Sequence, residues 1–196
     1  KRNRLAYLHP MIEAIKNWDE AAFLWLNSFH SSALDPIVLQ LTQTISWIPL
    51  YVLLLYQIYR IDPKNTAWIL GGVMLTILLS DQVTSGLMKP YFERLRPCHD
   101  PRWDGMLHLY GRCGGLYGFF SSHATNTFAL ATFYYMLLRN YSNYFIFLFA
   151  WALIVSYSRI YIGVHFPIDV LFGVCFGILL GYIFSLLPSK KYSNNV

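Results

Sequence analysis

The stretch "WILGGVMLTILLSDQVTSGLMKPYFERLRP", residues 68–97, decides the fold class of this chain. From Trp68 to Leu87 it carries one charge, Asp81. This is the length, roughly 20 residues, that an α-helix needs to cross the hydrocarbon core of a bilayer. Lys89 and Arg96 follow where the apolar run ends. A helix that is apolar along its length and basic at its end is typical of a membrane span that reaches the polar surface.

The whole chain has the composition of a membrane protein. Of its 196 residues, 56% are hydrophobic and 13% are charged, whereas a soluble domain usually carries about 25% charged residues. The net charge is +5, but the basic residues lie singly between apolar runs and form no basic helix face, which argues against nucleic acid as a partner. We therefore predict an all-α, polytopic membrane helix bundle in one domain, residues 1–196.

Five apolar runs bounded by turn-forming residues are predicted to cross the membrane. They are residues 36–59, 66–88, 122–138, 144–161 and 167–187. Residues 1–35 form an N-terminal helical region, in which residues 11–29 mix charges with apolar side chains at helical spacing. This pattern favours an amphipathic helix that lies in the membrane interface. The alternative is that part of it forms a sixth span.

The loop charges predict an orientation in the membrane. With five spans, the loops after the first and third spans and the C-terminus share one side, which we predict to be cytoplasmic by the positive-inside tendency. The basic residues of that side are Arg60, Lys64, Arg139, Lys190 and Lys191. The long loop of residues 89–121 then lies on the extracytoplasmic side. That side holds at least as many cations, which contradicts the tendency unless several of them bind a ligand.

Three junctions between predicted spans bring polar residues to this extracytoplasmic side. They are residues 89–97, 120–126 and 158–169. Lys89, Arg96 and Arg159 would repel one another if they met without an anion, so a phosphate or a similar group is their natural partner. Ser121 is a plausible N-cap of the third span, and the N–H groups that follow it form an anion site at a helix start. Simple capping by Ser121 is the alternative reading.

Two histidines at these junctions indicate chemistry in addition to binding. One imidazole can attack phosphorus while the other protonates the departing oxygen. His165 is followed four residues later by Asp169, whose carboxylate can hold the imidazole in the tautomer that exposes its other nitrogen. Because Pro167 places Asp169 in a first helical turn, the carboxylate could instead cap backbone N–H groups. Both roles for Asp169 stay open at this point.

These residues resemble the type 2 phosphatidic acid phosphatase superfamily, which also includes the vanadium haloperoxidases. The family motifs are K-x6-R-P, P-S-G-H and S-R-x5-H-x3-D. The first reads Lys89-x6-Arg96-Pro97 here, and the third reads Ser158-Arg159-x5-His165-x3-Asp169. The second motif keeps Ser121 and His123 but has Phe120 in place of proline and Ser122 in place of glycine. Ser122 retains the backbone N–H that would contact phosphate at the glycine position.

The resemblance implies a metal-independent phosphatase that needs no cofactor. His165 would be the nucleophile that forms a phosphohistidine, with Asp169 orienting it, and His123 would be the acid for the leaving group and then the base for water. The remaining residues would bind the phosphoryl oxygens and stabilise the transition state. These phosphate-binding residues are Lys89, Arg96, Arg159, Ser121 and Ser122.

Two further sets of residues are predicted to have structural roles. Asp81, Ser85 and Lys89 are spaced to share one helix face, so Asp81 is predicted to support Lys89 from below the pocket. The glycines at 173, 177 and 181 let a neighbouring helix approach closely, either inside the bundle or at a dimer seam.

The loop before the third span holds further candidates. Cys98 and Cys113 are predicted to form a disulfide, with free thiols as the alternative, whereas a zinc site with His99 and His108 has a spacing that fits no common finger. The nearby residues could form a lid, contact lipid headgroups or lie in a solvated loop; they are Arg102, Trp103, Tyr110 and Arg112.

We predict an integral membrane enzyme that removes phosphate from a lipid phosphate or diphosphate at the extracytoplasmic surface of a bacterial plasma membrane. The specific prediction is undecaprenyl diphosphate phosphatase, and the alternatives are phosphatidylglycerophosphate, phosphatidate and lipid A phosphate. A vanadium haloperoxidase would be a different chemistry on the same residues. A transporter or non-catalytic binder of anionic lipids would use the cations without requiring the pair of His165 and Asp169. The sequence makes no prediction of the oligomeric state.

Overall fold

The computed structural model describes the backbone of residues 2–192 and the side chains of residues 9–187. Within these residues the secondary structure is helical, with no strand and one isolated bridge between Leu95 and Tyr117. The predicted all-α membrane bundle is therefore confirmed. Lys190 and Lys191, which are predicted to be cytoplasmic, have side chains outside the described range.

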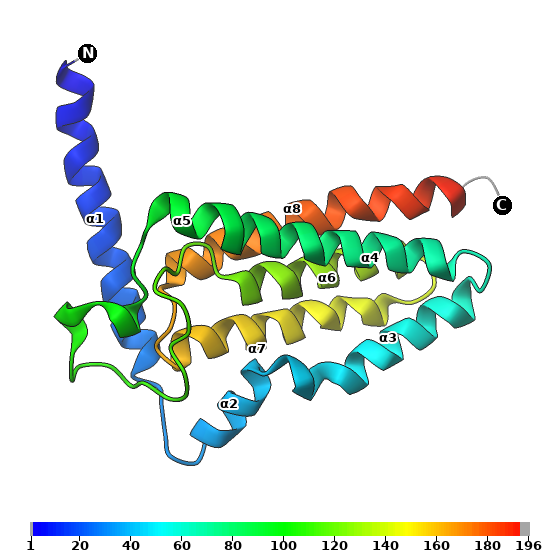
Figure 1. Cartoon of the computed structure of the whole chain (residues 1–196), viewed down its shortest axis with the longest axis horizontal. Coiled ribbons are helices and arrows are strands. Elements are labelled where there is room, and N and C mark those ends of the chain that lie inside the picture. Colours follow the sequence, from blue (N-terminus) through cyan, green and yellow to red (C-terminus); the bar gives the residue numbers. More distant parts are fainter. Residues whose placement is uncertain (1, 193–196) are drawn as a thin grey trace.

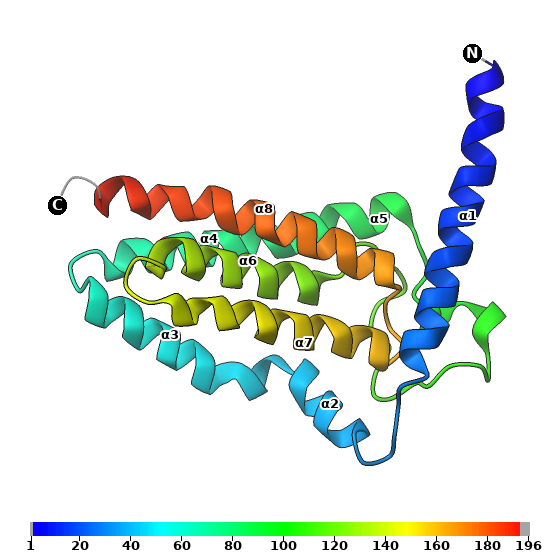
Figure 2. The same cartoon turned by 180° about the vertical axis from the view of Figure 1, so that it is seen from behind.

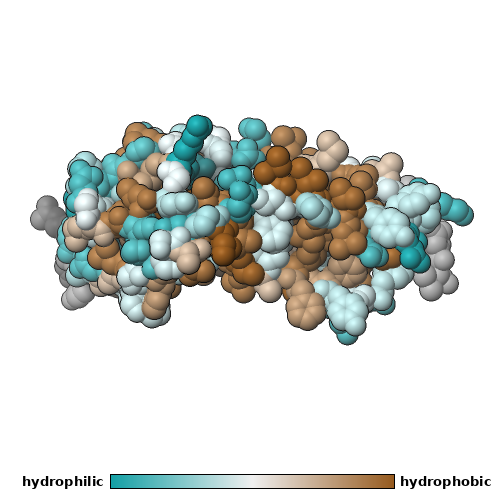
Figure 3. Space-filling model, turned by 90° about the horizontal axis from the view of Figure 1, so that it is seen from below, coloured by the Kyte–Doolittle hydropathy of each residue, from teal (hydrophilic) through white to brown (hydrophobic). Residues whose placement is uncertain are grey.

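Five helices run alongside one another and alternate in direction (Figure 1 and Figure 2). Their bounds are α3 (Ile48–Ile61), α4 (Thr66–Asp81), α6 (Ser122–Leu138), α7 (Phe147–Tyr161) and α8 (Pro167–Tyr192). Most of α6 is buried between its neighbours, with Phe133 and Leu138 at 0% exposure. Large apolar side chains on the outer helices are exposed, for example Met74 and Leu153, and apolar residues dominate the middle of the molecule in Figure 3. This surface suits contact with lipid tails.

Three helical stretches are long and apolar enough to cross a membrane. They are Thr66–Phe92, Asn143–Tyr161 and Pro167–Leu187, and a bent pair, Asp35–Thr42 with Thr44–Ile61, would make a fourth. The third predicted span corresponds to α6, which has 17 residues, the lower limit of about 17 residues for a span. The protein is thus an integral membrane protein, and the count of five spans stays a prediction.

The first predicted span, residues 36–59, is broken by a bend in the structure. It divides into α2 (Asp35–Thr42), a 3-10 turn η1 (Thr44–Trp47) and α3, and the two parts meet at 75°. Pro49 at the start of α3 lacks the N–H that a continuous helix would use, and Gln43 is extended. The Trp47 Nε1–H donates to the Leu41 carbonyl at 2.8 Å and closes the break.

The second predicted span continues beyond its expected end. After α4 the helix widens into a π-helical turn, η2 (Gln82–Met88), and ends as α5 (Lys89–Phe92). Such wide turns inside helices occur frequently at functional sites. Here the π turn carries Thr84 and Ser85 to the hydroxyl of Ser122 on α6, each at 3.0 Å.

The N-terminal helix α1 (Arg2–Asn27) crosses the end of the bundle and extends away from it (Figure 1). Its inner face buries Asp19, Phe23 and Asn27, spaced four residues apart. Exposed apolar side chains, Trp18 and Trp25 among them, lie on a different face. A helix across the bundle end with an exposed apolar face fits the predicted helix in the membrane interface.

The glycines of α8 pack against α6, which confirms internal packing over a dimer seam. A Cβ atom at Gly177 would lie 2.4 Å from the Thr125 carbonyl oxygen, and one at Gly181 would lie 2.3 Å from that of Ala129. These are backbone atoms, so the two helices would have to separate to accept a methyl group.

We expect Gly177→Ala to lower the melting temperature in detergent, because overpacking a tight contact costs about 1–3 kcal/mol. Gly71→Ala is the matched control, since a Cβ there meets nothing within 4 Å and alanine is the better helix former. Thermal unfolding followed by circular dichroism measures both. Equal melting temperatures for the two variants would contradict the close α6–α8 contact.

Candidate active site

The three junctions that carry the polar residues meet at one end of the bundle, beside α1 (Figure 1). Lys89 lies there at the start of α5, and its Nζ donates to the hydroxyls of Ser122 at 2.8 Å and Ser85 at 3.2 Å. The Ser85 hydroxyl in turn lies 3.3 Å from Asp81 Oδ1. Asp81, Ser85 and Lys89 therefore share one helix face, as their spacing predicts, and the hydrogen bonds orient the ammonium group toward the start of α6.

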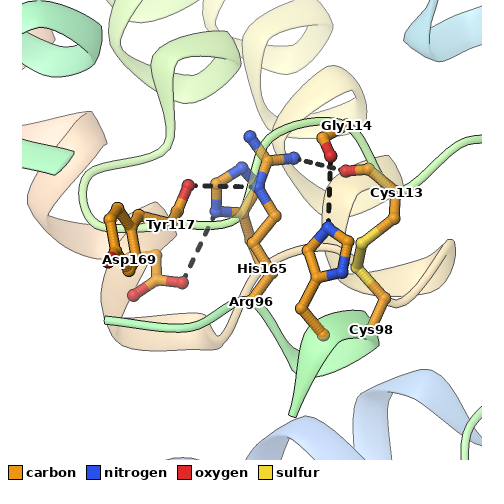
Figure 4. Close-up of a disulfide and its surroundings, with 8 residues drawn as sticks. Arg96, Cys98, Cys113, Gly114, Tyr117, His165 and Asp169 are labelled. Atoms are coloured by element: carbon orange, nitrogen blue, oxygen red, sulfur yellow. Dashed lines mark hydrogen bonds and ion pairs between the residues drawn. A yellow bond between two sulfur atoms is a disulfide. The ribbon is translucent and has the colours of Figure 1, made fainter. Parts of the chain in front are cut away.

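Arg96 is held by the carbonyl groups of the loop that precedes α6 (Figure 4). Its Nε donates to the Tyr117 oxygen at 3.1 Å and its Nη1 to the Cys113 oxygen at 2.7 Å. Cys113 is joined to Cys98 in a disulfide, so the predicted pairing is present and closes this loop. Gly114 has a φ of +82°, and a Cβ there would lie 3.1 Å from Arg96 Nη1. The loop is thus shaped around the guanidinium.

The candidate zinc set does not assemble. The His99 ring nitrogen and the two sulfur atoms lie within 4.8 Å of one another, but the sulfurs are bonded together and His108 lies elsewhere. The His108 Nε2 is 2.8 Å from Asp35 Oδ1. Arg102 pairs with Asp100 and with Glu20 of α1. These contacts fasten the loop to α1 and α2.

Arg159, in the last turn of α7, is buried with 8% exposure. One of its terminal nitrogens donates to the Thr42 hydroxyl at the end of α2. Its Nε has no hydrogen-bond partner among the described residues. A buried guanidinium with a free N–H is suited to bind an oxyanion.

Ser121 occupies the N-cap of α6, but its side chain makes no capping hydrogen bond. Its hydroxyl is buried and has no partner within the described part of the chain. The Ser121 N–H donates to the Asp169 carbonyl at 3.0 Å, which joins the start of α6 to the first turn of α8. Simple capping therefore does not occupy this hydroxyl, and it remains available to a ligand at the helix N-terminus.

His165 lies in the short loop between α7 and α8 and is 2% exposed. Its Nδ1 is 3.4 Å from Asp169 Oδ2, and the same carboxylate oxygen accepts the Phe166 N–H at 3.0 Å. Asp169 thus combines the two readings of the sequence, a cap of its own helix turn and a carboxylate beside the imidazole (Figure 4). Gly118 permits this approach, because a Cβ there would lie 3.1 Å from Asp169 Oδ2 and 3.5 Å from His165 Nδ1.

The surroundings keep His165 neutral. Burial above all, and then the positive charges of Arg96 and Arg159, lower the pKa of the imidazole well below its usual range. A neutral imidazole has a free lone pair, which a nucleophile needs. His123 lies in the first turn of α6, next to Ser122, whose hydroxyl accepts from Lys89 Nζ. The structure therefore brings both histidines and the cations to one place.

Two residues of this end of the bundle were missed by reasoning from the sequence. Arg94 bonds Asp169 Oδ1 through Nη1 at 2.6 Å and Asp19 Oδ2 through Nη2 at 2.5 Å. The other carboxylate oxygen of Asp19 accepts the Ile168 N–H at 2.8 Å. The sequence predicted an amphipathic helix for residues 11–29, but nothing in it placed Asp19 on a buried face or paired it with Arg94.

A cavity of about 480 Å³ begins at the candidate site and continues into the bundle. Ser122, His123 and Asp81 line its polar end, and Leu70 and Tyr134 line its far end. Tyr134 follows His123 on α6 by about three helical turns, or about 16 Å. The cavity therefore joins the start of α6, where Ser122 and His123 lie, to apolar side chains of α3, α4 and α6.

A family description, the PAP2 superfamily, matches residues 67–193 of this chain. Two curated relatives are lipid A 4′-phosphatases. That of Porphyromonas gingivalis is 35% identical over 173 residues, which cover 87% of this chain and 73% of the relative. That of Bacteroides thetaiotaomicron is 34% identical over 187 residues, which cover 92% of this chain and 81% of the relative.

Two crystal structures share the fold. The transmembrane PAP2-type phosphatidylglycerolphosphate phosphatase of Bacillus subtilis has a TM-score of 0.67 and 22% identity, covering 90% of this chain and 87% of that one. LpxE of Aquifex aeolicus has a TM-score of 0.62 and 24% identity, covering 84% of this chain and 92% of that one. These likenesses concern the architecture of the bundle.

Proposed function

Since this chain belongs to the PAP2 superfamily, the type 2 phosphatidic acid phosphatases, and is a membrane lipid phosphatase, we propose that its substrate is the phosphate group of lipid A. One observation carries the assignment to a lipid: Ser122 and His123 of the candidate site line the same cavity as the apolar side chains of Leu70 and Leu54. A soluble phosphate ester would gain nothing from such a cavity, whereas a lipid can place an acyl chain there.

The proposed reaction proceeds in two steps. The Nε2 of His165 attacks phosphorus, the bond between phosphorus and the sugar oxygen breaks, and His123 donates a proton to that oxygen. His123 then takes a proton from water, which attacks the phosphohistidine and releases inorganic phosphate and free His165. Lys89, Arg96 and Arg159 balance the negative charge that grows on the phosphoryl oxygens in both steps.

We propose that this mechanism needs no metal ion. Three cationic side chains converge on the place where a metal would otherwise neutralise the phosphoryl group. Arg159 Nε and the Ser121 hydroxyl add hydrogen-bond donors that are free within the described structure. Charge neutralisation and orientation are thus supplied by the protein.

The substrate class rests on the relatives and on the cavity together. Two relatives with at least 34% identity are named lipid A 4′-phosphatases, and a glucosamine phosphate with nearby acyl chains matches a polar site joined to an apolar cavity. Undecaprenyl diphosphate, the prediction made from the sequence, remains the second candidate. The active site would face the extracytoplasmic side of a bacterial plasma membrane, where the lipid headgroup meets the cations and the acyl chains stay in the bilayer.

Phosphate release by the purified protein in detergent, with a chelator present, tests this proposal. The panel contains lipid A, undecaprenyl diphosphate, phosphatidylglycerophosphate and phosphatidate. We expect lipid A to give the highest kcat/KM, with no loss of rate on adding the chelator. A faster reaction with undecaprenyl diphosphate would reject the proposed substrate, and inhibition by the chelator would reject the metal-free mechanism.

The same preparation distinguishes the other chemistries. Binding of all four lipids without phosphate release would indicate an anionic-lipid binder or transporter. Bromide oxidation that depends on added vanadate would indicate a haloperoxidase. Either result would overturn the proposed function.

A further inference from the structure

We propose that Arg94, bridged to Asp19 of the interfacial helix α1, is a positioning residue that holds Asp169 against His165. Neither residue belongs to the motifs from which the site was recognised. The inference rests on the proposed function, because it assigns their effect to the attack of His165 on phosphorus. It also gives α1 a role in the reaction that its position outside the helix bundle does not suggest.

The contacts of Arg94 determine the position of the Asp169 carboxylate. Arg94 Nη1 donates to Asp169 Oδ1 at 2.6 Å, while the other oxygen, Oδ2, faces His165 Nδ1 at 3.4 Å and accepts the Phe166 N–H at 3.0 Å. With both oxygens engaged, the carboxylate is held beside the imidazole. His165 Nδ1 has no hydrogen-bond partner among the described residues, so Oδ2 at 3.4 Å is the acceptor that an Nδ1–H would use, and that tautomer leaves Nε2 unprotonated for attack.

The charge of Arg94 matters as much as its geometry. Asp169 has 0% exposure, and a buried carboxylate without a counter-ion takes up a proton. A protonated Asp169 would be a weaker acceptor for the Nδ1–H and would no longer stabilise the positive imidazole that forms during phosphoryl transfer. Arg94 stabilises the ionised form through its ion pair with Oδ1, while Oδ2 is the oxygen beside the imidazole.

Arg94 is itself held by α1. Its Nη2 bonds Asp19 Oδ2 at 2.5 Å, and Asp19 Oδ1 accepts the Ile168 N–H at the start of α8. The guanidinium lies 4.3 Å from the centre of the Phe166 ring, and that ring packs edge-on against Phe23 of α1 at 5.1 Å. Asp19 is fully buried. One α1 residue thus fixes both the arginine and the helix turn that carries Asp169.

The test compares kcat and KM for lipid A phosphate in four variants: Arg94→Met, Arg94→Lys, Asp19→Asn and Glu20→Gln. We expect Arg94→Met to lower kcat about 10- to 100-fold while KM changes less than about threefold, because Arg94 orients the nucleophile. Arg94→Lys should recover only part of the rate, since an ammonium cannot bridge two carboxylates as a guanidinium does. Asp19→Asn should lower kcat about tenfold.

Glu20→Gln is the matched control. Glu20 is the next residue on α1 and pairs with Arg102, away from the catalytic histidines, so its loss should leave kcat unchanged. Arg94→Met combined with Asp169→Asn should be no slower than Asp169→Asn alone, because both act through the same imidazole.

Two outcomes would overturn the inference. The first is an unchanged kcat in Arg94→Met. The second is a double variant whose kcat falls by the product of the two single fold-losses, as independent structural damage would produce. A wild-type protein that releases no phosphate from any lipid would instead overturn the proposed function, so the two failures are distinguishable.

Discussion

His165→Gln is expected to abolish phosphate release from every lipid substrate while the helix bundle stays folded. Loss of a nucleophile typically lowers kcat by roughly 10⁴-fold or more, because no other group can form the covalent intermediate. Glutamine keeps a polar group near the position of Nε2 but has no nucleophilic lone pair. Released phosphate, measured at enzyme concentrations high enough to detect slow turnover, gives the size of the loss.

The control for this variant is His9→Gln on α1. The His9 side chain is 78% exposed and contacts only Glu13, at 3.7 Å, among the described ion pairs. It should retain full activity and the same melting temperature as the wild type. A His165→Gln protein that is folded and still turns over would show that another residue attacks phosphorus, and His123 would be the first candidate.

The sequence predicted the end of the bundle where the polar residues meet, because alternation of spans is a strong constraint. Three junctions separated by up to 80 residues must share a membrane face once the spans are placed, and the structure puts them beside one another. The spacing of the glycines in α8 likewise predicted a close contact with a neighbouring helix, since such contacts require small residues. Both inferences depend on periodicity, which a sequence displays directly.

Other features depend on contacts that leave no periodic trace. Pro49 alone suggests a break between α2 and α3. The angle of 75° at this break depends on the hydrogen bonds that Trp47 and Thr42 make with other parts of the chain. The ion pair between Asp19 and Arg94 joins α1 to the loop that follows α5, and these two segments are far apart in the sequence. The two roles of Asp169 are combined because one oxygen, Oδ2, lies near both the Phe166 N–H and His165 Nδ1 while the other bonds Arg94.

The second large effect is expected for His123→Gln, with a different signature from the loss of His165. Without the general acid, kcat on lipid A should fall about 10²- to 10⁴-fold. An aryl phosphate, whose leaving group departs without a proton, should be affected far less in the first step. Attack by water on the phosphohistidine still needs the base, so the covalent intermediate should accumulate.

The measurement is the amount of labelled phosphate bound to the protein after a brief reaction with a radiolabelled aryl phosphate. A phosphorus–nitrogen bond survives alkali and is lost in acid, which separates it from a serine ester. His123→Gln should trap close to one phosphate per site, and His165→Gln should trap none. Label on the His165→Gln protein would reverse the roles of the two histidines, because only the residue that attacks phosphorus can carry the phosphoryl group.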